Sequence, residues 1–266
     1  MIHLRGLSIA TRGRENFPFS VAALRDLELE FRAPVTVLVG ENGTGKSTLL
    51  EGIACASGSI AVGSSGSIDE DRSLDAVRPL ARAMKLVWNR PTHRGFFMRA
   101  EDFFGFVNRV KTEQATFERE AVRVRAENAD MAPADLARMV GAYTGSAGAL
   151  ADRYGSDMDA MSHGEQFLAF FRSRLVPKGL YLLDEPEVAL SPTSQLAFLA
   201  LLIDAAGEEE CQFLIATHSP ILMAMPGADI LSFDGGSVAR IDFDEVEHVR
   251  LTREFLEAPE RFLRHL

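Results

Sequence analysis

Nine consecutive residues, Gly40 to Thr48, have the types and spacing that hold a phosphate chain. They read GENGTGKST and match the P-loop pattern G-x-x-x-x-G-K-[ST]. Glycines allow the backbone conformations that turn successive N–H groups toward a phosphate. Lys46 is expected to reach the terminal phosphates, and the Ser47 hydroxyl is expected to ligate Mg²⁺. The predicted nucleotide-binding residues of the loop are Gly40, Glu41, Asn42, Gly43, Thr44, Gly45, Lys46, Ser47 and Thr48.

The segments on either side of the loop favour a phosphate site over an ordinary glycine-rich turn. Residues 35–39 (VTVLV) are apolar and rich in valine, which predicts a buried strand. Residues 49–54 predict the first turns of a helix, whose N-terminus would add partial positive charge. Strand, glycine loop and helix in this order predict binding of a nucleoside triphosphate.

Two acidic residues and a histidine follow predicted strands later in the chain. Four apolar residues lead into Asp184 and Glu185, which is a Walker B pattern. In that pattern Asp184 holds the Mg²⁺ shell, and Glu185 is placed to orient or polarise the attacking water. His218 follows the next predicted strand and is expected to contact the γ-phosphate, although a lone histidine is more often structural.

The alternation of strands and helices predicts an α/β P-loop NTPase with a mainly parallel sheet flanked by helices. Residues 2–9 and 24–31 alternate in hydrophobicity and predict an antiparallel N-terminal β subdomain. From residue 57 a glycine- and serine-rich loop and helical segments interrupt the alternation. The expected division of one domain, 1–266, is a nucleotide-binding core at 1–56 and 161–266 and an inserted loop and helical lobe at about 57–160.

The inserted lobe is expected to contain one long helix and a shorter one. The long helix carries an apolar seam with spacings of four and three, formed by Phe103, Val107, Val110, Gln114, Phe117, Ala121 and Val124. It is expected to end near residues 128–133 and to pack against the protein's own body, with a coiled-coil stub as the alternative. Residues 134–154 predict a further short helix with a Gly/Ser break.

Composition and charge narrow the class of protein. The 266 residues are 47% hydrophobic and 25% charged, and no apolar run is long enough to span a membrane. Two cysteines far apart in the sequence predict a cytoplasmic protein without a disulfide framework. The net charge of −10 argues against a protein that coats nucleic acid. Residues 72–125, however, hold 12 Lys and Arg against 6 Asp and Glu, which indicates an anionic partner or a solvated helical face.

Four motifs in this order resemble the ATP-binding-cassette (ABC) ATPases: GENGTGKST, MSHGEQ, YLLDEPEVALSP and ATHSP. The similarity is to the soluble branch that includes the RecF-like and structural-maintenance-of-chromosomes (SMC)-like ATPases. Ser162 precedes Asp184 by 22 residues and Asp184 precedes His218 by 34, as in that family. The resemblance covers nearly the whole chain and is weakest from 57 to 160.

The resemblance implies an ATPase that uses ATP and Mg²⁺ and dimerises around ATP. Residues 161–165 match the signature motif LSGGQ, so Ser162 and Gly164 would contact the γ-phosphate of ATP held by a second copy. Ser162 with an acidic residue three positions later also predicts an N-capped helix, and both readings can hold. The Q-loop has no clear match. By position Glu101 is the expected substitute on the metal side, and Gln114 is the second option.

Three roles stay open at the level of sequence. The first is an ATP-driven switch on a nucleic-acid or protein partner, bound through residues 72–125, in repair or defence. The second is the nucleotide-binding subunit of an ABC transporter with a separate membrane subunit. The third, a partner of a toxin or defence effector that senses ATP, shares the chemistry of the first. The variant motifs and the basic segment favour the first role.

Overall fold

The computed structural model describes residues 1–62, 68, 71–154 and 161–264, and contacts divide the chain into two units. The core unit is Met1–Ala100 with Leu175–Leu266, and the helical unit is Glu101–Arg174. This division assigns residues 57–100 to the core unit and 161–174 to the helical unit, whereas the sequence-based boundaries were about 57 and 160. Within the segment expected to be inserted, 63–67, 69–70 and 155–160 lie outside the described residues.

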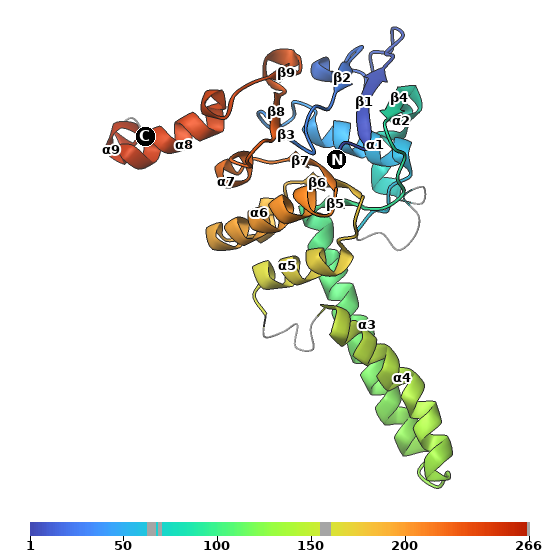
Figure 1. Cartoon of the computed structure of the whole chain (residues 1–266). Helices are drawn as coiled ribbons and strands as arrows, with labels where there is room; N and C mark the ends of the chain where they lie inside the picture. Colours follow the sequence, from blue (N-terminus) through green and yellow to red (C-terminus); the bar gives the residue numbers. More distant parts are fainter. Residues whose placement is uncertain (63–67, 69–70, 155–160, 265–266) are drawn as a thin grey trace. The chain divides into compact units, whose positions relative to one another are not determined.

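A six-stranded sheet forms the centre of the core unit, in the order β5-β6-β7-β3-β8-β9 (Figure 1). Neighbouring strands run parallel except β8 and β9, which are antiparallel. Every residue of β3, β6 and β7 is buried, which is typical of parallel strands covered on both faces. The strands are β3 (Val35–Val39), β5 (Phe97–Arg99), β6 (Leu180–Asp184), β7 (Gln212–Ala216), β8 (Asp229–Ser232) and β9 (Ala239–Arg240).

Helices flank this sheet, as the sequence predicts. Helix α1 packs against β5, β6 and β7, and α2 packs against α1, while α6 and α7 pack against each other beside the strands (Figure 1). The helices of the core unit are α1 (Lys46–Ser57), α2 (Arg78–Ala83), α6 (Pro192–Gly207), α7 (Pro220–Met223), α8 (Glu247–Glu257) and α9 (Pro259–Leu263). Short 3₁₀ turns lie at Ala22–Leu24, Arg72–Leu74, Pro186–Ala189, Asp234–Gly236 and Phe243–Glu245. The α/β P-loop architecture is confirmed.

A second, antiparallel sheet contains the N-terminal strand. Its order is β2-β1-β4, formed by β2 (Glu28–Glu30), β1 (Leu4–Ile9) and β4 (Met84–Trp88). The predicted strand over 24–31 is shorter in the structure, because Ala22–Leu24 forms a 3₁₀ turn that buries Ala23 and Leu24. The predicted antiparallel β subdomain is therefore confirmed, and it extends to β4.

One hydrophobic cluster joins the two sheets through α1. Leu49, Leu50 and Ile53 are fully buried in α1, and they belong to the same cluster as Leu7 of β1 and Leu214 of β7. Full burial of one such side chain contributes about 1.5–3 kcal/mol. This packing fixes the start of α1, and with it the glycine loop, at the C-terminal end of β3.

The helical unit consists of α3 (Ala100–Glu127), which begins at the last residue of the core unit, α4 (Pro133–Tyr154) and α5 (His163–Arg174). Helices α3 and α4 lie side by side (Figure 1), and Ala121 and Val124 of the apolar seam pack against Val140 of α4. The Phe103 ring contacts the Phe167 ring of α5 edge-on, at a centroid distance of 5.1 Å. The end of the seam thus packs against α4 in a two-helix hairpin, which fits the coiled-coil stub, and its start packs against α5.

Helix α4 has no break, and the Gly/Ser interruption predicted within 134–154 is wrong. The Thr144 hydroxyl donates to the Val140 carbonyl at 3.2 Å, and the Ser146 hydroxyl donates to the Ala142 carbonyl at 2.9 Å. These hydroxyls are satisfied by the preceding turn, so they do not compete for the helical backbone. Across the part of the chain that the structure describes, no helix has the length and apolarity needed to cross a membrane.

Candidate nucleotide-binding site

The glycine loop is wrapped tightly between β3 and α1. Gly40 has φ 133°, and a Cβ there would come within 2.8 Å of Asp234 Oδ1. Gly45 has φ 107°, and a Cβ there would come within 2.5 Å of Val21 Cγ1. Only glycine combines these backbone angles with this lack of space. The sequence therefore has glycine where the loop must turn its backbone inward.

The remaining residues of the loop line its outer rim. Glu41, Asn42 and Gly43 are exposed, and the Thr44 hydroxyl donates to the Glu41 carbonyl at 2.8 Å. Thr48 is partly buried in the first turn of α1. Helix α1 has no side-chain cap, so its first N–H groups are presented to the loop. This arrangement fits an anion above the helix start.

Lys46 is held inside the loop. Its side chain is 5% exposed, and Nζ donates to the carbonyls of Gly40 at 2.6 Å and Glu41 at 2.9 Å. Burial lowers the pKa of Lys46, and the charges of Glu185 and Asp184 oppose that shift. A buried cation at the mouth of a backbone cradle is suited to phosphate oxygens.

Ser47 and Asp184 meet at the end of β6. The Ser47 hydroxyl donates to Asp184 Oδ1 at 3.1 Å, and Asp184 is 8% exposed. Burial raises the pKa of Asp184 to about 7, against the hydrogen bond from Ser47, which lowers it. A bound cation would compensate for burying this carboxylate.

The oxygen donors of this pair fit Mg²⁺. Among the described residues, no group of three or more His, Cys, Asp or Glu side chains could hold a metal ion. One hydroxyl and one carboxylate leave the other positions to phosphate and water, which is how Mg²⁺ is usually bound beside a nucleotide.

Glu185 and His218 come from the ends of neighbouring parallel strands. The Glu185 backbone has φ 49°, in the left-handed region, and its N–H donates to the Ala216 carbonyl at 2.9 Å. This conformation is costly for a residue other than glycine and is typical of functional sites. Glu185 Oε1 lies 3.8 Å from His218 Nε2, and the Glu185 side chain is 41% exposed. The structure thus brings both expected catalytic residues beside Asp184 and Lys46.

Two carboxylates that the motifs did not single out hold the site together. Glu187 Oε1 accepts from the His218 backbone N–H at 2.6 Å, and burial raises the pKa of Glu187. Asp234 Oδ1 accepts from the Glu41 N–H at 2.9 Å, and Asp234 Oδ2 accepts from the Ser232 hydroxyl at 3.0 Å. Glu187 lies in the YLLDEPEVALSP motif, and Asp234 precedes two glycines. The backbone groups they bind could not be inferred from these patterns.

Arg99 is a third residue that sequence reasoning missed. It is 7% exposed, lies opposite Asp184 in the β5–β6 register, and pairs with Glu51 at 2.8 Å. The charge of Arg99 lowers the pKa of Asp184, which opposes the effect of burial. A lone arginine after a short apolar run carries no signal that would have identified this role.

The expected signature residues and Glu101 belong to the helical unit. The Ser162 backbone N–H and hydroxyl donate to Glu165 Oε2 at 2.8 and 2.7 Å, and the Glu165 N–H donates to Ser162 Oγ at 3.3 Å. This is the predicted capping box at the start of α5. Gly164 is buried in the same turn, and Glu101 is exposed in the first turn of α3. Their roles toward a nucleotide stay predictions.

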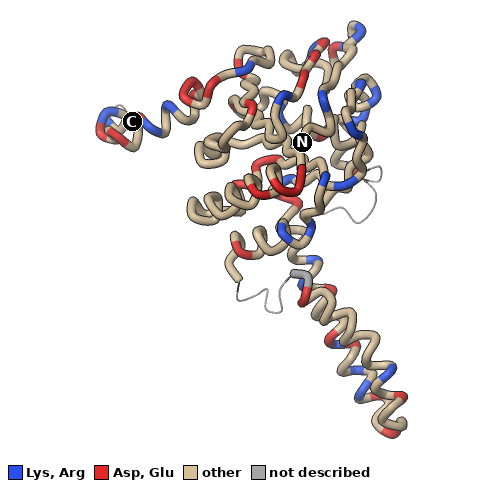
Figure 2. Tube along the Cα trace, viewed as in Figure 1, with Lys and Arg blue, Asp and Glu red and all other residues tan. Residues whose placement is uncertain are grey.

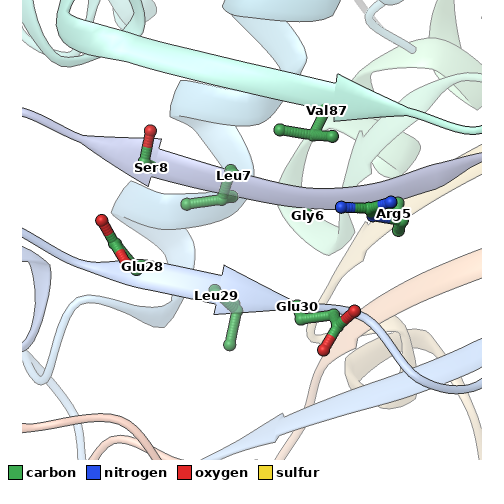
Figure 3. Close-up of a pocket in the computed structure, with 8 residues that line it drawn as sticks. All are labelled: Arg5, Gly6, Leu7, Ser8, Glu28, Leu29, Glu30 and Val87. Carbon is green, nitrogen blue, oxygen red and sulfur yellow. The ribbon is translucent and has the colours of Figure 1, made fainter.

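A separate cavity of about 320 Å³ lies on the antiparallel sheet (Figure 3). Its lining residues come from β1, β2 and β4, and they are Arg5, Gly6, Leu7, Ser8, Glu28, Leu29, Glu30 and Val87. The lining includes no residue of the glycine loop. This cavity is therefore distinct from the candidate nucleotide site, which lies around Lys46 and Asp184.

Two family models match the chain around this site. One, described as "AAA domain", matches residues 16–80, which include the glycine loop. The other, described as "AAA domain, putative AbiEii toxin, Type IV TA system", matches residues 158–224, which include Ser162, Asp184 and His218. The matched ranges thus contain the glycine loop, Ser162, Gly164, Asp184, Glu185, Glu187 and His218, but not Arg99, Glu101 or Asp234.

Individual relatives cover different shares of the chain. The OLD nuclease of Thermus scotoductus is 36% identical over 76 residues, which are 29% of this chain and 13% of the nuclease. The phosphite import ATP-binding protein PxtA of Stutzerimonas stutzeri is 27% identical over 208 residues, 76% of this chain and 70% of that protein. The Smc head domain of Pyrococcus furiosus, solved with the C-terminal domain of ScpA, is 14% identical with a TM-score of 0.48. That likeness covers 98% of this chain and 100% of the head domain.

The glycine loop, the Walker B strand and the strand order define a P-loop ATPase fold. The two AAA-domain matches and the match to an ATP-binding protein agree with this class. Membership of this class implies that the chain uses a nucleotide. The match to the OLD nuclease spans so little of that protein that its nuclease activity does not transfer to this chain.

Proposed function

We propose that the chain binds ATP with Mg²⁺, hydrolyses it, and acts as an ATP-driven switch in the form of an ATP-dependent homodimer. The observation that carries the proposal is the contact of Ser47 with Asp184 at 3.1 Å, with Glu185 and His218 beside it. Release of phosphate from ATP by the purified chain tests the enzymatic part.

The proposed mechanism assigns one task to each group. Lys46 and the loop N–H groups bind the β- and γ-phosphates, and Ser47 and Asp184 hold the metal ion. When bound, Mg²⁺ neutralises charge that develops on the phosphate oxygens. Glu185, which is more exposed than Asp184, orients the attacking water and accepts its proton. His218 donates to the γ-phosphate.

Dimerisation is proposed because the signature residues are on a different unit from the glycine loop. The capping box marks Ser162 as the start of α5, and the first N–H groups of a helix suit an anion. ATP held by one copy would be completed by Ser162 and Gly164 of a second copy. The γ-phosphate provides this contact and ADP does not, so ATP alone would favour the dimer.

The Glu185→Gln variant, which retains ATP, is expected to be a dimer in ATP and Mg²⁺ and a monomer or weak dimer in ADP. Ser162→Arg in that background should prevent the dimer, because a bulky cation would occupy the contact, while each chain still binds ATP. Light scattering after size exclusion measures the molar mass of each variant in ATP and in ADP. Ser146→Arg on α4 is the matched control, and Ser162→Ala reports the loss of the cap alone. A Glu185→Gln protein that remains monomeric at tens of micromolar with ATP would contradict the homodimer.

The charge of residues 72–125 is divided unevenly between the two units. Residues 72–100, in the core unit, hold seven Lys and Arg and one acidic residue, whereas 101–125 hold five of each sign. Figure 2 shows the basic positions recurring along α2 and β4. Arg82, Lys85 and Arg90 are exposed there. We therefore propose this part of the core unit as the surface for an anionic partner, with nucleic acid as the candidate.

Nucleic-acid binding at this surface is expected to weaken steeply with salt, because phosphate contacts release counterions. Each phosphate neutralised on duplex DNA contributes about −0.9 to the slope of log K against log salt. Arg82→Glu with Lys85→Glu should reduce both affinity and slope, and Arg138→Glu on α4 should change neither. Fluorescence anisotropy with a labelled duplex, with and without ATP, measures this. Absence of binding at low salt would exclude nucleic acid as the partner of this surface and would favour a protein partner.

A second candidate function is the nucleotide-binding subunit of a transporter. It is supported by the match to the phosphite import protein over 76% of this chain. The repair- or defence-type role is supported by the toxin-related family description and by the OLD nuclease match. A permease gene beside the gene of this chain would favour the transporter, and a nuclease or defence gene would favour the switch.

A further inference from the structure

A second histidine contacts the expected catalytic histidine. His248 Nε2 lies 2.9 Å from His218 Nδ1, and the ring centroids are 4.8 Å apart. His248 is in the first turn of α8, between the buried residues Val246 and Val249. Its side chain is 23% exposed. Helix α8 is thereby anchored so that one of its side chains reaches the nucleotide site.

The hydrogen bond between the two rings leaves two arrangements of protons. If His248 donates from Nε2, then neutral His218 carries its own proton on Nε2. If His218 donates from Nδ1 instead, the neutral ring has a bare lone pair at Nε2. The first arrangement gives His218 a donor on the side of Glu185, and the second gives it an acceptor.

Two carboxylates favour the first arrangement. Glu41 Oε1 lies 4.0 Å from His248 Nε2, and Glu185 Oε1 lies 3.8 Å from His218 Nε2. In the first arrangement both of these nitrogens carry a proton, which a nearby carboxylate favours, although the His248 N–H points at His218 rather than at Glu41. In the second arrangement both of these nitrogens carry a lone pair. Burial lowers the pKa of His218, and the charges of Lys46 and His248 lower it further, so the neutral ring is the relevant form.

We propose that His248 is a positioning residue that holds His218 in the tautomer with its proton on Nε2, directed at the phosphates. His218 Nε2 is buried and has no hydrogen-bond partner among the described residues, so this donor is available to a ligand oxygen. The Glu187 carboxylate holds the His218 backbone, and His248 fixes the ring. The consequence for catalysis rests on the proposed ATPase function, whereas the assignment of the His218 tautomer does not depend on it.

The tautomer can be measured without nucleotide turnover. In ¹⁵N-histidine-labelled protein, protonated and unprotonated ring nitrogens have well-separated chemical shifts, and His218→Asn identifies the His218 signals. We expect the proton on Nε2 in the wild type, a mixture of tautomers in His248→Phe, and the wild-type pattern in His248→Gln, whose amide N–H replaces the donor. A proton on Nδ1 in the wild type, or no change in His248→Phe, would overturn the proposal.

Kinetics test whether the tautomer matters for turnover. His248→Phe keeps the ring volume and is expected to lower kcat by on the order of 10- to 100-fold, with little change in KM for ATP. His248→Gln should restore most of the rate, and His93→Phe, an exposed histidine, is the control. Adding His248→Phe to His218→Ala should cost nothing further, because His248 acts only through His218. Independent, multiplicative losses would contradict this role. A wild-type chain without ATPase activity would refute the proposed function and leave the tautomer measurement decisive.

Discussion

Replacing Glu185 with Gln is expected to lower ATP turnover by about 10²- to 10⁴-fold, the usual contribution of a general base. The amide keeps the size of the carboxylate but cannot accept a proton from water. Glu185 makes no contact with the backbone of the glycine loop in the hydrogen bonds of the described residues, so ATP affinity should stay close to that of the wild type. Single-turnover phosphate release and equilibrium ATP binding measure the two effects separately.

A matched control for this variant is Glu208→Gln, at the exposed C-terminal end of α6. It makes the same chemical change away from the site and should leave both quantities unaltered. Hydrolysis at the wild-type rate in Glu185→Gln would assign the general base to another residue. Equal losses of binding and turnover would instead indicate that the loop itself had been disturbed.

Replacing Lys46 with Ala is expected to weaken ATP binding on the order of 100-fold or more. Hydrogen bonds to a charged group contribute about 1.5–3 kcal/mol each, and Lys46 can donate several to the terminal phosphates. The side chain is also buried, so Ala would leave a hole in the loop. Lys46→Met fills that volume without the charge, and it should bind ATP as weakly as Lys46→Ala.

The control for Lys46 is Lys85→Ala, an exposed lysine on β4. Isothermal titration calorimetry with ATP compares the three variants with the wild type, and thermal unfolding verifies that each is folded. Unchanged affinity in both Lys46 variants would mean that the glycine loop is not the nucleotide site.

Much of the fold could be predicted because hydrophobic pattern and motif context agree. The central parallel strands β3, β6 and β7 are mainly apolar, and residues with recognisable chemistry mark two of their ends: Asp184 ends β6, and His218 lies two residues after β7. The sheet that β4 (Met84–Trp88) joins could not be predicted. Strand β4 pairs with β1, whereas β5 pairs with β6. Sheet membership depends on contacts between residues far apart in the sequence, so the hydrophobic pattern does not reveal it.

The supporting residues of the site could not be predicted, for a related reason. Glu187, Asp234 and His248 act on backbone or ring atoms of residues that lie 30 or more positions away, or in another element. No spacing rule links such partners. The predicted Gly/Ser break in α4 was wrong for a different reason. The Thr144 and Ser146 hydroxyls donate to backbone carbonyls of the same helix, so they do not interrupt it.

The central claim is that Lys46, Ser47, Asp184 and Glu185 form a Mg²⁺-dependent ATPase site. The most direct measurement is phosphate release from ATP by the purified wild-type chain, with Mg²⁺ and with excess chelator, beside Lys46→Met and Glu185→Gln. We predict steady release that requires Mg²⁺ and is abolished in both variants. Release that continues without Mg²⁺, or at the wild-type rate in either variant, would contradict the assignment of this site.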